Sequence, residues 1–409
     1  MKKLALGIVG LGGRGLSLLE QLAQMEDVSV AAVCDEYPDR VAQGAELAQT
    51  YGHTPKEYID YHLLVDDPHV DAVITPSSWA SHVPVCCYAM ERGKRPATEV
   101  GGAYSIHQCW ELVRTSQRTG VPVMMLENCC YDFCEQTLLH MTRMGLFGEL
   151  VYCTGGYQHH LQEEVGMGRE NRHYRLDNYL ARCCDNYPTH ELGPIAKILD
   201  IHNGNRFVSL TSTATKAVGL KDWASRRRGE KDPIAAGMVA QGDVVTTVIR
   251  CARGEVVTLV LDTTLPRPYS RNGRVQGTRG LWMEDKGDSN NPAATSMIYL
   301  EGVSQPEQWL PFAPYAEDPR YNPLWHWYKT EGIRGGHGGM DYLVLRAFVE
   351  SVLEDKAPPI DVYDAAAWMA VTALSEQSIA LGSAPQAFPD FTDGAWIKKT
   401  PYPQGRYAL

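Results

Sequence analysis

The chain has 409 residues, of which 44% are hydrophobic and 21% are charged, a composition typical of a globular protein with two domains. Lys and Arg total 38 against 49 Asp and Glu, and the resulting formal net charge of -11 disfavours nucleic acid or an anionic membrane surface as a partner. No apolar run approaches the roughly 20 residues that span a bilayer. The 11 cysteines are an odd number without a Cys-x-x-Cys pattern, and glycines interrupt the apolar N-terminal run. We therefore expect free thiols, no secretory leader and a cytoplasmic location.

The first 35 residues carry a nucleotide-binding pattern. Residues 4–9 form an apolar run that fits a buried parallel strand, and a Gly-x-Gly-x-x-Gly motif follows at 10–15. Residues 16–22 have helical spacing, and residues 28–34 resemble a second strand. The glycines let the backbone turn tightly and approach a pyrophosphate, whose charge then lies at the helix N-terminus. Because strand, turn, helix and strand occur in order, we predict a dinucleotide-binding fold.

The acid after the second strand indicates which dinucleotide is bound. Asp35 follows Gly15 by 20 residues, the spacing at which a carboxylate accepts hydrogen bonds from the adenosine ribose. An acid at this place favours NAD over NADP, because a 2′-phosphate would meet a like charge. Arg40 nearby weakens that preference. NAD is the predicted cofactor.

Strands and helices continue to alternate to about residue 130, which predicts an α/β domain with a doubly wound parallel sheet of the Rossmann type over residues 1–130. The further elements expected are a strand at 72–75, helices at 83–91 and 105–118, and a strand at 121–126. Ligands bind beyond the carboxyl ends of such strands, which points to the polar segments after them. The predicted cofactor-binding residues are Gly10, Gly12, Gly13, Arg14, Gly15, Asp35, Ser78, Trp79, His82, Glu99 and Asn128.

Residues 131–409 differ in pattern and are predicted to form an α+β domain with a large, antiparallel-rich sheet, which serves the substrate, catalysis and oligomerisation. Two runs rich in β-branched residues, 243–251 and 255–261, are joined by a short turn and predict a β-hairpin. The other expected features are polar insertions or lids around 162–185 and 221–232 and a helix over 361–380. We leave open that the C-terminal helices pack back on the first domain.

Three stretches of the second half combine Gly, Tyr and His: 154–160, 186–194 and 335–342. His190 and His337 stand at expected helix entries in Gly- and Pro-rich surroundings, which makes them candidates for proton transfer beside a dinucleotide. Tyr157, Tyr187 and Tyr269 are candidates as well, although tyrosines in such places commonly serve packing. No histidine or cysteine spacing matches a metal site, so no metal is expected.

The chain resembles the Gfo/Idh/MocA oxidoreductase superfamily and, within it and over nearly its whole length, the NAD-dependent glycosidases of glycoside hydrolase family 109. The stretches that carry the resemblance are 126–128 with Tyr131, 145–151, 155–159, 187–190, 203–206, 241–247, 267–269, 275–278, 336–342 and 389–394. Dehydrogenases of the superfamily usually have Glu-Lys-Pro where this chain has Glu99-Val100-Gly101, and an Asp where Asn186 precedes His190 by four residues. A dehydrogenase that needs the lysine as proton relay is therefore hard to build here.

The resemblance implies a glycosidase that uses NAD as a catalyst. NAD takes a hydride from C3 of the sugar, a base removes the C2 proton, the aglycone leaves C1, water adds back and the hydride returns. The resemblance also implies that Glu127, Tyr157, Tyr187, His190 and Tyr269 surround the sugar. His190 and Tyr187 are the candidates for the proton transfers at the C3 hydroxyl and at C2. Tyr157, Glu127 and His337 complete the expected catalytic set.

The substrate remains open at this point. The resemblance implies an N-acetylgalactosaminide, on which family members mostly act. The segment before Tyr187 carries four arginines, which either present positive charge to an anionic sugar such as a sulfoquinovoside or form a solvated loop: Arg169, Arg172, Arg175 and Arg182. Two other classes compete: a net NAD-dependent sugar dehydrogenase, and a catalytically silent NAD-binding regulator, which the polar groups at the predicted crevice disfavour. A small glycoside is the expected partner, and we expect a homo-oligomer.

Overall fold

The structure is a computed structural model that describes residues 3–284 and 292–409. The chain divides into two compact units. The first unit comprises residues 1–131, 331–366 and 401–409, and the second comprises 132–330 and 367–400. Residues 331–366, although distant in sequence, therefore belong to the same unit as the Gly-x-Gly-x-x-Gly motif.

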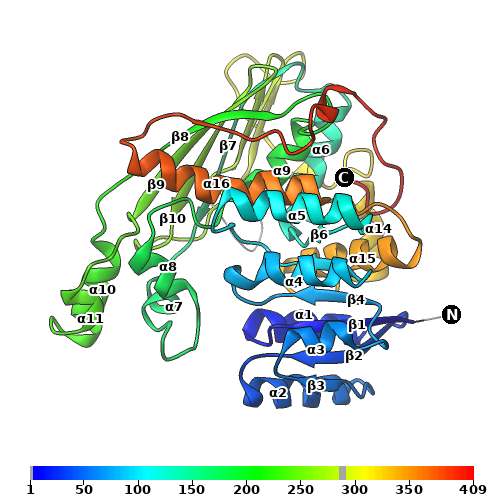
Figure 1. The fold of residues 1–409 in the computed structure, drawn as a ribbon. Coiled ribbons are helices and arrows are strands. Elements are labelled where there is room, and N and C mark those ends of the chain that lie inside the picture. Colours follow the sequence, from blue (N-terminus) through cyan, green and yellow to red (C-terminus); the bar gives the residue numbers. More distant parts are fainter. Residues whose placement is uncertain (1–2, 285–291) are drawn as a thin grey trace. The chain divides into compact units, whose positions relative to one another are not determined.

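The first unit is built on a six-stranded parallel sheet in the order β3-β2-β1-β4-β5-β6 (Figure 1). The strands are β1 (Leu4–Val9), β2 (Val28–Cys34), β3 (Lys56–Tyr58), β4 (Ala72–Thr75), β5 (Arg95–Thr98) and β6 (Met124–Met125). Strands β1, β2 and β4 have the predicted bounds, because their apolar side chains are buried on both faces of the sheet. The last strand is shorter than the predicted 121–126. Chain order reverses between β1 and β4, which is where doubly wound sheets bind ligands.

Five helices connect these strands in the described part of this unit, and three further helices follow the last strand. The connecting helices are α1 (Gly13–Ala23), α2 (Pro38–Thr50), α3 (Tyr61–Asp66), α4 (Trp79–Glu91) and α5 (Ile106–Thr119). The later ones are the short η1 (Asn128–Tyr131) and η2 (His337–Gly339), and α15 (Met340–Leu353). Helix α1 begins inside the glycine motif rather than after it, so its N-terminus lies at the end of β1. Helix α15 packs on α1, β1 and η1. The late segment thus completes the core beside the first strand.

The second unit contains a nine-stranded mixed sheet in the order β14-β13-β12-β11-β7-β10-β9-β8-β15. Its strands are β7 (Leu150–Gln158), β8 (Phe207–Ala214), β9 (Val244–Cys251), β10 (Val256–Asp262), β11 (Arg274–Gly277), β12 (Gly280–Met283), β13 (Met297–Leu300), β14 (Leu310–Pro311) and β15 (Gln386–Ala387). The predicted hairpin is β9 with β10, and every pairing between the described strands of this sheet is antiparallel except that of β7 with β10. The predicted antiparallel-rich sheet is confirmed.

Helices of the second unit are α6 (Phe133–Arg143), α7 (Gln162–Gly166), α8 (Arg175–Ala181), α9 (Thr189–Ile198), α10 (Gly219–Arg228), α11 (Pro233–Ala236), α12 (Pro292–Thr295), α13 (Ala313–Ala316), α14 (Pro323–Glu331) and η3 (Ala395–Ile397). Helix α9 packs on β7 and on α6. The segments predicted as insertions or lids contain α7, α8 and α10, and α10 packs on α7 and α11. Helix α16 (Val362–Ala380) runs through the point where the two units divide.

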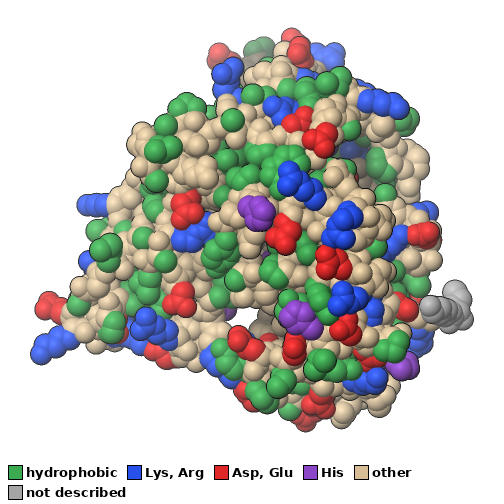
Figure 2. Space-filling view, in the orientation of Figure 1, with side chains coloured by type: hydrophobic (Ala, Val, Ile, Leu, Met, Phe, Trp, Pro, Cys, Tyr) green, Lys and Arg blue, Asp and Glu red, His purple; other side chains and the backbone are tan. Residues whose placement is uncertain are grey.

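Charged side chains of both signs are interspersed on the face drawn in Figure 2, so the negative net charge is not gathered into one patch there. Among the helices of the described residues, we find none that is both long enough and apolar enough to cross a bilayer.

Candidate active site

The glycine-rich turn between β1 and α1 leaves room for a diphosphate. Gly10 has a φ of +105°, and a Cβ at Gly15 would lie 1.9 Å from the carbonyl oxygen of Gly10, so neither position tolerates a side chain. A Cβ at Gly13 would meet no described heavy atom within 4 Å, and no side chain caps the N-terminus of α1 at Gly12. A helix N-terminus with open space before it suits the phosphates of a dinucleotide.

Asp35 lies one residue beyond β2 and is buried. Its Oδ2 accepts the N–H of Leu11 at 2.7 Å, and its Oδ1 accepts the N–H of Tyr37 at 3.0 Å. A carboxylate has about four acceptor positions. These two bonds therefore fix the carboxylate and leave acceptor positions for ribose hydroxyls, so the residues present fit an NAD molecule.

Three other predicted residues of the first unit join one hydrogen-bonded network. Nε of Arg14 donates to Oε1 of Glu99 at 2.8 Å, and its two terminal nitrogens donate to the carboxylate of Asp341. The side-chain amide of Asn128 donates to Oδ1 of Asp341 at 2.7 Å. Nδ1 of His337 lies 2.7 Å from Oδ2 of the same carboxylate. His337 thus lies in the first unit beside Arg14, and its predicted role at the sugar stays a prediction.

The remaining predicted cofactor residues lie at the start of α4. Ser78 precedes the helix, and Trp79 and His82 are buried in its first turns. Burial lowers the pKa of His82 to about 4, so its ring is neutral, and Nε2 lies 3.1 Å from the carbonyl oxygen of Ser77. The imidazole therefore holds the turn after β4. Contact of these three residues with NAD stays a prediction.

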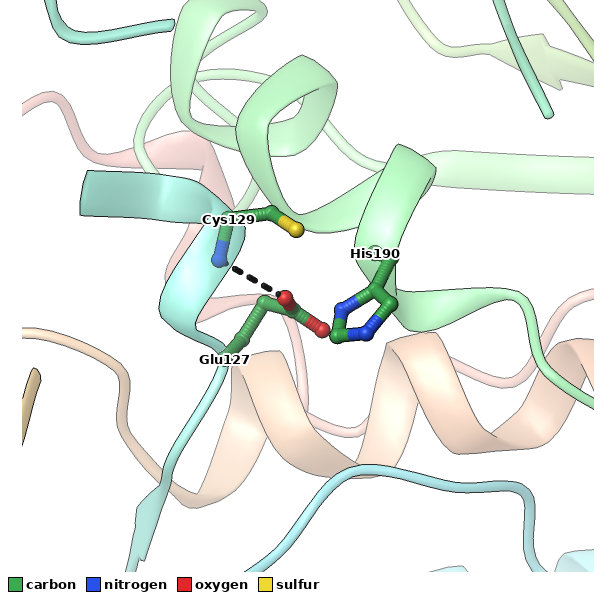
Figure 3. Close-up of side chains that lie close together, drawn as sticks. All are labelled: Glu127, Cys129 and His190. Atoms are coloured by element: carbon green, nitrogen blue, oxygen red, sulfur yellow. Dashed lines mark hydrogen bonds between the residues drawn. The ribbon is translucent and has the colours of Figure 1, made fainter. Parts of the chain in front are cut away.

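Glu127 follows β6 and is completely buried. Its Oε1 accepts the backbone N–H of Cys129 at 3.0 Å, the bond drawn dashed in Figure 3. This bond orients the carboxylate at the carboxyl end of the parallel sheet. Figure 3 also labels His190, which belongs to α9 of the second unit.

The second unit brings four of the predicted sugar-binding residues together. The ring of Tyr157 lies 4.5 Å from that of Tyr187, 5.7 Å from that of His190 and 6.4 Å from that of Tyr269, measured between centroids. The rings of Tyr187 and His190 are 5.0 Å apart. We call Tyr157, Tyr187, His190 and Tyr269 the aromatic cluster.

Three elements position the aromatic cluster. Tyr157 lies near the end of β7, and Tyr187 and His190 lie at the entry of α9, which packs on that strand. Tyr269 lies in the loop after β10. Its neighbour Ser270 exchanges two backbone hydrogen bonds with Gln158, at 3.2 and 3.0 Å. The sheet thus brings residues from three separate segments to one place.

Burial and one cation set the charge at the aromatic cluster. Burial raises the pKa of Tyr157 to about 12, although Arg175 opposes the shift, so the phenol is protonated at neutral pH. The guanidinium carbon of Arg175 lies 4.9 Å from the centroid of the Tyr187 ring. One of its nitrogens lies 3.3 Å from a carboxylate oxygen of Glu164. The cluster therefore offers hydroxyl and imidazole groups with one partly balanced positive charge.

The four arginines of the segment before Tyr187 do not share one location. Arg182 donates to Glu376, with Nε 3.0 and 3.1 Å from the two carboxylate oxygens, and Arg169 and Arg172 are exposed. Arg175 alone of the four lies over Tyr187. The sequence showed the charge of these residues but gave no sign of which one would be buried.

The segment before Tyr187 is held by buried polar groups, of which the sequence indicated only Asn186. The amide of Asn186 donates to Oε1 of Gln241 at 3.2 Å. The Asp185 N–H donates to Oγ of Ser375 at 2.9 Å, and the Asp185 carboxyl accepts the backbone N–H of Tyr187. Asn186, which stands where dehydrogenases of the superfamily tend to have an Asp, is thus bonded to a buried glutamine of the same unit.

Residues 4–127 match the family model described as oxidoreductase family, NAD-binding Rossmann fold, and residues 131–398 match the model of the C-terminal domain of glycosyl hydrolase 109. The protein is an NAD-dependent glycoside hydrolase. It belongs to glycosyl hydrolase family 109, and its cofactor is NAD.

Two relatives match nearly the whole chain. A glycosyl hydrolase family 109 protein of Stenotrophomonas maltophilia is 38% identical over 98% of this chain and 91% of its own length. An alpha-N-acetylgalactosaminidase of Tannerella forsythia is 36% identical over 97% of this chain and 88% of its own length. The solved structure of an NAD-binding oxidoreductase from Klebsiella pneumoniae has the same fold, with a TM-score of 0.72 and 16% identity over 95% of this chain and 99% of that one.

We predict that Asp35→Ala weakens NAD binding by about 10- to 100-fold, because a charge-assisted hydrogen bond to the ribose is lost. Asp35→Asn removes the charge but keeps one side-chain oxygen, which can accept only one of the two N–H groups of Leu11 and Tyr37. Isothermal titration of nucleotide-free protein with NAD measures the effect. Glu46→Ala, an exposed carboxylate on α2, is the control and should bind NAD like the unmodified protein. Equal affinity in all variants would place Asp35 away from the ribose.

A second prediction concerns Asp185, whose burial raises its pKa to about 7. In the unfolded chain the same carboxyl ionises near pH 4. The folded protein therefore binds more protons between about pH 4 and pH 7, so the free energy of unfolding falls as pH rises through this window and the loss levels off above pH 7.

Asp185→Asn does not titrate and should lose that dependence. Between pH 4 and pH 7 the unmodified protein should lose on the order of 3 kcal/mol of unfolding free energy that Asp185→Asn does not lose. The urea midpoint of Asp185→Asn should therefore rise relative to that of the unmodified protein over this range. Asp393→Asn, an exposed residue, is the control and should follow the unmodified protein at each pH. Parallel midpoints for Asp185→Asn and the unmodified protein would show that Asp185 is ionised throughout this range.

Proposed function

We propose that the protein cleaves N-acetylgalactosaminides at the aromatic cluster. The observation that carries this proposal is that the ring centroids of Tyr187, His190 and Tyr269 lie within 6.4 Å of the ring centroid of Tyr157. All four residues lie in the part of the chain that matches the family 109 model. The Tannerella forsythia relative, named alpha-N-acetylgalactosaminidase, supports the choice of sugar.

Each group of the cluster has a chemical role in this proposal. Bound NAD supplies reversible hydride acceptance at C3 of the sugar. His190 takes and returns the proton of the C3 hydroxyl, because an imidazole can act as both base and acid. Tyr187 lies at the same helix entry and moves the proton at C2. Tyr157, which keeps its proton, donates a hydrogen bond to a sugar oxygen.

Glu127 completes the proposed set from the first unit. Its carboxylate is oriented by Cys129, and a carboxylate accepts hydrogen bonds from sugar hydroxyls. Elimination across C2 and C1 needs no pair of carboxylates as acid and nucleophile, and NAD-dependent glycoside hydrolysis is an exception to that scheme.

The charge at the cluster favours a neutral sugar over an anionic one. Arg175 is paired with Glu164, and Arg182 is paired with Glu376, so a sulfonate would meet one cation that already has an acidic neighbour. A buried anion needs charge-assisted bonds to offset its desolvation. A sulfoquinovoside is therefore the weaker candidate.

We further infer a cytoplasmic location and a homo-oligomeric state. All 11 cysteines are free and ten of them are buried, which suits a reducing compartment. Light scattering on the purified protein tests the oligomeric state.

Incubation with a panel of nitrophenyl glycosides tests the function. The panel includes α- and β-linked N-acetylgalactosaminides and a sulfoquinovoside, each with and without added NAD, and both the aglycone and NADH are followed. We expect aglycone release from the N-acetylgalactosaminides without accumulation of NADH. Stoichiometric NADH would indicate a sugar dehydrogenase, and release from the sulfoquinovoside alone would overturn the choice of sugar.

Hydrolysis in deuterium oxide tests the bond-breaking step. Because the C2 proton leaves before the aglycone and a solvent proton later replaces it, the released sugar should carry deuterium at C2. Mass spectrometry and proton NMR of the product measure this. Turnover with only protium at C2 would contradict elimination.

His190→Ala is predicted to lower kcat by about 10²- to 10⁴-fold, the usual contribution of a general acid–base group. The NAD content should not change, because the proposed role of His190 is proton transfer and not cofactor binding. His107→Ala, an exposed histidine of α5, is the matched control and should keep full activity. Near-native activity of His190→Ala would remove this residue from the mechanism.

A further inference from the structure

Asp341 is a completely buried carboxylate at the start of α15, and several donors converge on it. Nη1 of Arg14 donates to Oδ2 at 2.6 Å, and Nη2 donates to Oδ1 at 3.0 Å. The Asn128 amide also donates to Oδ1, and His337 Nδ1 lies beside Oδ2. One carboxylate thus contacts three side chains from three separate segments.

Arg14 itself lies between two buried carboxylates. Besides Asp341, its Nε donates to Glu99, whose other oxygen accepts the N–H of Val100 at 2.9 Å. Burial alone would raise the pKa of Asp341, but the bonds from His337 and Arg14 hold it well below its usual range. The pair is therefore ionised at every working pH, and its planar, two-bond geometry is a strong one.

The three segments held in this way surround the predicted cofactor site. Arg14 belongs to the glycine-rich turn after β1, Glu99 follows β5, and Asn128 follows Glu127 at the end of β6. All three lie at the carboxyl ends of parallel strands, where doubly wound sheets bind nucleotides. Loss of the Asp341 charge would leave Arg14 and Asn128 with fewer acceptors and free to move.

We propose that Asp341 is a positioning residue that locks Arg14 and Asn128 in place and thereby slows the release of NAD. This inference rests on the NAD-dependent function given above. In a reaction that returns NAD to its starting oxidation state, the cofactor need not leave between turnovers. A preorganised site that retains its cofactor suits such a reaction, whereas a net dehydrogenase must release NADH after each turnover.

The test measures NAD release without any glycoside. Protein loaded with labelled NAD is diluted into excess unlabelled NAD, and the retained label is followed over time. We expect Asp341→Asn to release NAD at least tenfold faster than the unmodified protein. Asp27→Asn is the matched control. It breaks the 2.6 Å ion pair between Asp27 and Arg346, which lies on α15 like Asp341, and it leaves the bonds of Arg14 in place.

Asp27→Asn should release NAD at the unmodified rate. Equal acceleration in both variants would mean that α15 merely stabilises the unit and would overturn the proposal, as would an unchanged rate in Asp341→Asn. Arg14→Lys provides a second route if Asp341→Asn fails to fold, because lysine keeps the charge but cannot bridge both carboxylates. It should also release NAD faster.

The double variant Arg14→Lys with Asp341→Asn should release NAD no faster than the faster single variant, since both disrupt the same contact. Fully multiplicative effects would show that the two residues act independently and would overturn the lock. These rates are distinct from the glycosidase assay. A protein without glycosidase activity that still shows this pattern would refute the proposed substrate and leave the lock standing.

Discussion

The ion pair between Arg14 and Asp341 ties the nucleotide-binding motif to the start of α15 within the first unit. It joins residues 327 positions apart, one in the glycine-rich turn and one at the start of α15. Since the carboxylate is fully buried, it requires the arginine and the Asn128 amide to offset its desolvation. The apolar face of α15 packs on α1, β1 and η1, and the ion pair fixes the start of this helix, with His337, beside Arg14.

The second unit meets a different constraint, because its aromatic cluster places two buried tyrosines beside a half-buried imidazole and a half-buried tyrosine, and these side chains need a fixed main chain. Hydrogen bonds made by neighbouring residues fix the main chain next to these side chains. Ser270 pairs with Gln158, and the residues before Tyr187 are bonded to Gln241 and Ser375. Buried donors and acceptors thus hold the backbone, so the polar atoms of the cluster's side chains are not needed to hold it.

Much of the fold was predictable because its signals are local. The strands at 4–9, 28–34 and 72–75 and the hairpin of β9 with β10 follow from apolar runs and β-branched residues, and the bounds agree closely. The segments 162–185 and 221–232, predicted as insertions or lids, contain α7, α8 and α10, and their assignment as insertions or lids stays a prediction. These helices bury few apolar residues each, so the apolar pattern of the sequence did not indicate them.

The family, the cofactor and the candidate residues of the site could be predicted from the residue order, because the glycine motif, Asp35 and the Tyr-Pro-Thr-His stretch are short local patterns. The position of Arg175 over Tyr187, the bonds of Asp341 to Arg14 and the place of His337 beside Arg14 follow from the packed structure alone. These contacts join residues far apart in the chain, and burial, which gives each its strength, is a property of the packed structure rather than of the residue order.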